Sequence, residues 1–102
     1  MATPSGIDVD PARTPARDLR DLVLDTLGRE ICAGIIAVGM TFTTESIESR
    51  FHVSRPVVRE ALRALEALGL IEAKRRVGVR VMPATRWNAY DLQVIRWRLA
   101  GP

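Results

Sequence analysis

The sequence contains few of the residues from which catalytic sites are built. It has one cysteine and one histidine among 102 residues, so no internal disulfide can form. A Ser-His-acid triad would have to use His52, which is the only histidine available as a base. No glycine-rich phosphate-binding loop occurs either. We therefore expect that this protein is not an enzyme and that it has no cofactor.

The sequence also has no apolar run that is long enough to cross a bilayer. Residues 1–18 lack the apolar segment of a secretory signal. Together with the single free thiol of Cys32, this favours a reducing, cytoplasmic location and no membrane partner. Hydrophobic residues make up 47% and charged residues 26% of the chain, a balance typical of one small globular domain.

Charge is distributed unevenly along the chain. The net charge is only +3. Residues 1–49 contain four arginines and eight acidic residues, which gives −4. Residues 50–80 contain eight basic and three acidic residues, which gives +5. A concentrated positive segment of this kind is expected of a phosphate-binding surface, although a solvated helix face would give the same pattern.

Apolar spacing predicts three helices after a tail. Prolines and small polar residues predict that residues 1–15 are disordered. From Ala16, apolar residues recur every four positions and predict a helix that stops near Gly34. A short second helix, capped by Thr43 or Thr44, should end near His52. A third helix over residues 55–68 should be capped by Ser54 and have Pro56 in its first turn. The buried positions predicted for the first and third helices are Leu19, Val23, Leu27, Ile31, Val58, Ala61, Leu62 and Leu65.

A hairpin should follow the third helix. Residues 70–73 and 79–81 have the composition of two short strands, separated by the basic turn 74–78. Ile36 and Phe42 should anchor the apolar loop 35–42 into the core. The predicted fold class is therefore mainly α with a small β-hairpin, a winged helix-turn-helix over residues 16–83.

Two groups of basic residues make double-stranded DNA the expected partner. Arg55, Arg59 and Arg63 are spaced by four and should line one face of the third helix, where guanidinium groups can pair with guanine or phosphate. Lys74, Arg75 and Arg76 crowd the hairpin turn, and Gly78 would let its backbone approach DNA closely. The alternative is a winged helix that serves only as a protein-interaction module, which Glu45 and the small net charge favour.

The segments Phe51–Glu66 and Gly69–Glu72 resemble the N-terminal domain of the GntR family, and within it the FadR-type regulators. The resemblance implies a sequence-specific transcription regulator that binds a palindromic operator as a homodimer. Three departures from the family pattern stand out: Glu45 replaces a basic residue, and His52 and Arg76 replace glycines. The DNA contacts that the resemblance implies fall on Thr44, Glu45, Ser54, Arg55, Pro56 and Arg59, with a wing contact near Arg76 and Gly78.

Residues 84–102 are similar to the linker and first helix of the FadR-type effector domain, in members that respond to sugar acids. We expect the rest of that domain, and its effector site, to lie outside these 102 residues. Its usual metal site cannot form with one histidine. Trp87 and Trp97 should pack at a domain interface. Together with Tyr90, Val94 and Ile95 they should leave an apolar surface uncovered.

Overall fold

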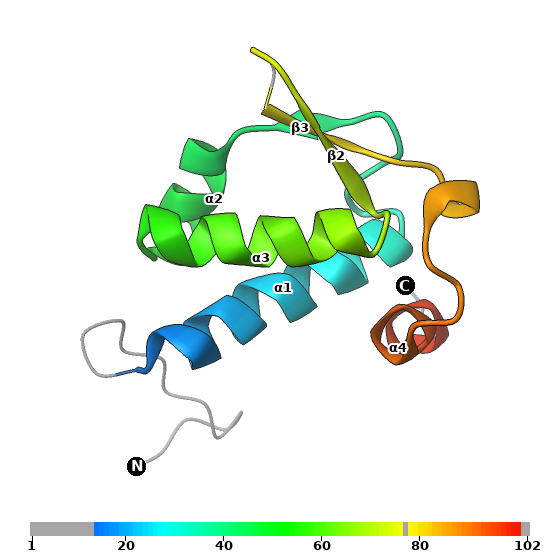
Figure 1. Cartoon of the computed structure of the whole chain (residues 1–102), viewed down its shortest axis with the longest axis horizontal. Coiled ribbons are helices and arrows are strands. Elements are labelled where there is room, and N and C mark those ends of the chain that lie inside the picture. The colour runs from blue at the N-terminus through cyan, green and yellow to red at the C-terminus, as the bar shows by residue number, and fades with distance from the viewer. Residues whose placement is uncertain (1–13, 77, 101–102) are drawn as a thin grey trace.

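The computed structural model describes residues 14–76 and 78–100 (Figure 1). Most of the expected tail, residues 1–13, lies outside the described residues. The order of elements is helix, short helix, longer helix and hairpin, followed by one more helix, and it is that of a winged helix-turn-helix. The elements are α1 (Ala16–Cys32), β1 (Thr41–Phe42), α2 (Thr44–Phe51), α3 (Arg55–Ala67), β2 (Ile71–Lys74), β3 (Gly78–Val81), the 3-10 turn η1 (Ala84–Arg86) and α4 (Leu92–Ala100).

The core lies between α1 and α3, which cross each other in Figure 1. All eight apolar positions predicted for these two helices are buried. Each of the leucine, isoleucine and valine side chains among them contributes about 1.5–3 kcal/mol to the free energy of unfolding when it is fully buried. Ile47 adds the buried face of α2. The helical spacing in the sequence is therefore confirmed as the pattern that forms the core.

The turn between α2 and α3 contains a residue in the left-handed backbone conformation, at the position where the family pattern usually has glycine. His52 ends α2 with φ 55° and ψ 46°. The N-cap of α2 is Thr43, whose Oγ1 accepts a hydrogen bond from the Ser46 N–H at 3.1 Å. Thr44 is therefore the first residue of the helix and not its cap. Val53, the next residue of the turn, is buried in the core.

The sheet has one more strand than we predicted. Its order is β1-β3-β2, and both pairs are antiparallel. β1 lies in the segment interpreted as an apolar loop, where Phe42 pairs with Val79. The basic turn is shorter than the predicted range 74–78. Lys74 is the last residue of β2 and pairs with Gly78, the first residue of β3. Ile36 and Phe42 are half-buried against the core, as expected.

The C-terminal helix α4 packs against α1 (Figure 1). The expectation of an uncovered apolar surface is wrong for Val94 and Trp97, which are 0% and 3% exposed. It holds for Tyr90, which is 94% exposed. Trp87 is half-buried, and its Nε1–H donates to the Met82 carbonyl at 2.8 Å. No helix among the described residues has the length and apolar character to span a membrane.

Candidate nucleic-acid interface

The exposed face of α3 carries the three arginines that the sequence placed together. Arg55, Arg59 and Arg63 are all exposed, whereas Val58 and Leu65 face the core. The three arginines line one shallow depression, together with Pro56 and Glu60. The predicted arginine face is therefore present, and its guanidinium groups are open to a large ligand.

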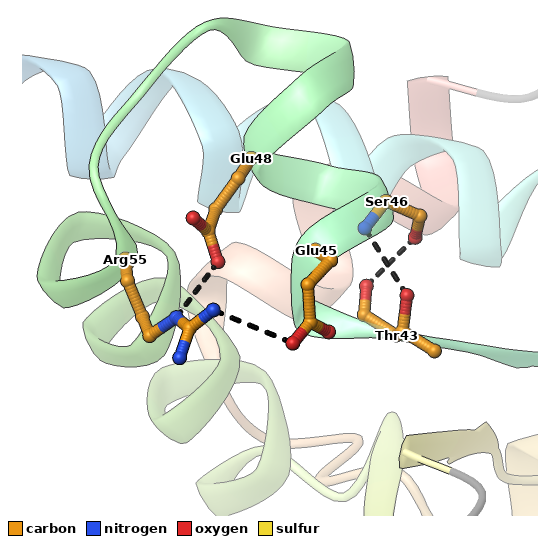
Figure 2. Close-up of polar contacts among 5 residues, drawn as sticks. All are labelled: Thr43, Glu45, Ser46, Glu48 and Arg55. Carbon is orange, nitrogen blue, oxygen red and sulfur yellow. Dashed lines mark hydrogen bonds and ion pairs between the residues drawn. The ribbon is translucent and has the colours of Figure 1, made fainter.

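Arg55 differs from the other two because α2 supplies it with two carboxylates (Figure 2). Its Nε donates to Oε2 of Glu48 at 3.1 Å, and its Nη2 donates to Oε2 of Glu45 at 3.4 Å. In the part of the chain that the structure describes, Arg59 and Arg63 form no ion pair. The arginine face thus combines one neutralised cation with two uncompensated ones.

A second depression joins this face to the sheet. Arg59 and Arg63 line it from α3, and Ala73 and Val79 line it from β2 and β3. The same two arginines also line the first depression. The arginine face of α3 and the adjoining side of the hairpin therefore form one continuous surface, which we call the α3–wing surface.

The other residues singled out at the helix-turn-helix have mixed surroundings. Ser54 is the exposed N-cap of α3, and its hydroxyl makes no capping hydrogen bond within the described chain, so it is available to a phosphate. Pro56 lies in the first turn of α3, where its missing N–H is not needed. Thr44 is half-buried at the start of α2. Glu45 is 69% exposed and is engaged with Arg55.

The wing turn exposes Arg75 and Arg76. Arg76 has φ 74°, the left-handed conformation for which a glycine is favoured, so its side chain is accommodated at some cost in strain. Lys74 is less available than predicted, because its Nζ lies 2.5 Å from Oε1 of Glu72. Hydrogen bonding from Lys74 and its nearby charge lower the pKa of the Glu72 carboxyl.

Two polar contacts near this surface were missed by sequence reasoning. Glu48 bonds Arg55 and lies one helical turn from Glu45, a spacing that could have indicated a shared face. Arg50 donates to both carboxylate oxygens of Glu30 and ties α2 to α1. This hydrogen bonding raises the pKa of the Arg50 guanidinium. No local pattern indicates the Arg50–Glu30 pair, since it joins residues 20 positions apart.

Comparison with known proteins identifies the family. Residues 19–81 match the family described as bacterial regulatory proteins, gntR family. The chain belongs to the GntR family. The GntR-family chain is 38% identical over 80 residues to the galactonate operon transcriptional repressor of Escherichia coli, covering 78% of this chain and 35% of that protein. It is 33% identical over 88 residues to the probable D-xylose utilization operon transcriptional repressor of Paenarthrobacter nicotinovorans. That match covers 86% of this chain and 37% of that protein.

The fold is shared with a protein whose structure has been solved in complex with DNA. The chain is similar to Streptococcus agalactiae BusR in complex with its busAB-promotor DNA, with a TM-score of 0.63 and 20% identity over 79% of this chain and 37% of that one. The chain therefore spans about a third of the length of the relatives that it matches. Since the family consists of transcription regulators, the expectation that the protein is not an enzyme is confirmed.

Proposed function

We propose that this GntR-family chain is the DNA-binding part of a transcription regulator and recognises double-stranded DNA by sequence. The observation that carries the proposal is the α3–wing surface. On it, the face of α3 that bears the arginines is continuous with one side of the hairpin. α3 would enter the major groove, so that Arg59 and Arg63 could contact base edges. Arg75 and Arg76 at the wing turn would contact the sugar-phosphate backbone beside that groove.

The whole regulator is proposed to be of the FadR type and to act in the cytoplasm as a homodimer on a palindromic operator. Residues 84–102 would then be the linker and the start of a helical effector domain. α4 packs against α1. This contact supports a fixed course of the chain from the DNA-binding part to the proposed effector domain. A sugar acid or another small organic acid is the proposed effector, because one relative is a galactonate operon repressor.

A protein-interaction module remains the second candidate, and one observation favours it. Glu45 and Glu48 surround the first arginine of α3 and reduce the positive charge of the surface. The salt dependence of binding to duplex DNA distinguishes the candidates. A DNA-binding domain that neutralises phosphates loses affinity steeply as salt rises, and an interaction module shows no such slope.

Replacing Arg59 by alanine is predicted to weaken binding to the preferred duplex by about 1–3 kcal/mol and to relax base preference at particular positions. The reason is that Arg59 is exposed, lines both depressions and forms no ion pair within the described chain. The preferred duplex would be selected from a randomised pool with the unaltered chain, and affinities measured by fluorescence anisotropy. Arg96→Ala, at an exposed arginine of α4, is the control for loss of one positive charge. An equal loss on preferred and random duplexes would show that Arg59 contacts only phosphate.

Neutralising the wing turn should weaken binding to all sequences alike. We predict that Arg75→Gln combined with Arg76→Gln flattens the dependence of log affinity on log salt by at most about two units, since each phosphate contact contributes about 0.9. The measurement is a salt titration on random duplex DNA. An unchanged slope would place the wing turn away from the DNA.

A further inference from the structure

The three arginines of α3 are not electrostatically equivalent. Two of the three guanidinium nitrogens of Arg55 donate to carboxylates of α2, and the third, Nη1, has no partner among the described residues (Figure 2). Arg55 with Glu45 and Glu48 carries a net charge of −1. Arg59 and Arg63 keep their full positive charge. The corner of the surface where α2 meets α3 is therefore acidic.

This charge pattern distinguishes between the two kinds of group that DNA offers. A phosphate bound to Arg55 would lie within a few ångströms of two carboxylates, and like charges at such distances are screened little when the Debye length is about 10 Å. A base edge such as the O6 and N7 of guanine carries no net charge and meets no such repulsion. Arg55 is also held in one orientation by two contacts, so less rotamer entropy is lost when it donates to a base.

We propose that Glu45 and Glu48 are specificity-determining residues that keep Arg55 from binding DNA phosphates and reserve it for the preferred base sequence. This inference rests on the proposed DNA-binding function. Glu48, with 24% of its side chain exposed, is the inner partner that orients Nε. Glu45, with 69% exposed, is the outer partner that faces an approaching duplex. Their effect is a low affinity for random DNA at this corner, and hence a higher ratio of specific to non-specific binding.

The test compares Arg55→Ala in two backgrounds of the full 102-residue chain, on a duplex selected from a randomised pool and on a random-sequence duplex. In the unaltered background, Arg55→Ala should weaken the selected duplex by about 5- to 150-fold. The same change should leave the salt slope on random duplex unchanged, because Arg55 contacts no phosphate there. In the Glu45→Gln, Glu48→Gln background the slope on random duplex should steepen, and Arg55→Ala should then reduce it by about one unit.

Glu60→Gln is the matched control. Glu60 lines the same depression as Arg55 but makes no ion pair within the described chain. Its removal reports the general effect of one acidic charge, and that effect should not depend on Arg55. Circular dichroism confirms that each variant folds.

Two results would overturn the inference while the DNA-binding function stands. One is a slope on random duplex that already falls by about one unit with Arg55→Ala in the unaltered background. The other is an Arg55→Ala variant that binds both duplexes as the unaltered chain does. Salt-independent or undetectable binding of the unaltered chain to both duplexes would instead refute the proposed function, and this inference with it.

Discussion

Replacing Trp97 by alanine is expected to lower the free energy of unfolding by about 3–5 kcal/mol, as for other buried large aromatic side chains. Trp97 is 3% exposed, and its ring lies on Gly28 of α1. Its Nε1–H donates to Oδ1 of Asp25 at 2.8 Å. Since small domains are stable by about 5–15 kcal/mol, urea denaturation should show a large shift in midpoint. Leu99→Ala, in the same helix but with 81% exposure, is the control and should change little.

A second substitution tests the same contact, because its effect on the free energy of unfolding should have opposite signs in two backgrounds. A Cβ at Gly28 would lie 2.5–2.6 Å from three ring carbons of Trp97, so Gly28→Ala should destabilise the unaltered chain by displacing α4. In the Trp97→Ala background the clash is gone. Alanine should then stabilise α1 by about 0.8–1 kcal/mol over glycine. The same sign of effect in both backgrounds would contradict the docking of α4 on α1 in solution.

Local patterns in the sequence were sufficient to predict the elements that place the site. Side chains at helical spacing from Leu19 to Ile31 and from Val58 to Leu65 indicated the packed faces of α1 and α3 directly, because burial repeats with the helical period. The spacing of Arg55, Arg59 and Arg63 likewise gave their shared face. The left-handed conformation of His52 was instead implied by the family resemblance, since the family pattern usually has glycine at that position.

Contacts between distant segments could not be predicted in this way. β1 has two residues, too few for an alternating pattern, and it exists because Thr41 and Phe42 pair with residues nearly 40 positions further on. The bond between Trp97 and Asp25 joins residues 72 positions apart. The pairing of Arg55 with Glu48 depends on the angle at which α2 meets α3, which no local pattern specifies. The missed features of the candidate interface are therefore those set by tertiary packing.

In the structure, Gly78 has a different role from the one that was predicted from the sequence. It was singled out for close approach of the wing to DNA. In the structure it has φ 93°, and a Cβ there would lie 2.3 Å from the carbonyl oxygen of Phe42 and 3.2 Å from Cα of Thr43. Glycine is thus required for β1 to pair with β3. Because Thr43 caps α2, this contact also connects the wing to the helix-turn-helix.

Gly78→Ala is therefore predicted to cost about 1–2 kcal/mol for the left-handed conformation and about 1–3 kcal/mol for displacement of β1. Gly39→Ala is the matched control. Gly39 has a similar φ of 86° but no atom within 4 Å of the added Cβ, so only the conformational cost should appear. Thermal and urea unfolding of the two variants gives the difference, which measures the contact with β1. Hydrogen exchange should also show loss of protection at the amides that join β1 to β3, since these bonds require the close approach. Equal destabilisation by the two substitutions would mean that β1 moves aside at no cost and that the wing is not held against the start of α2.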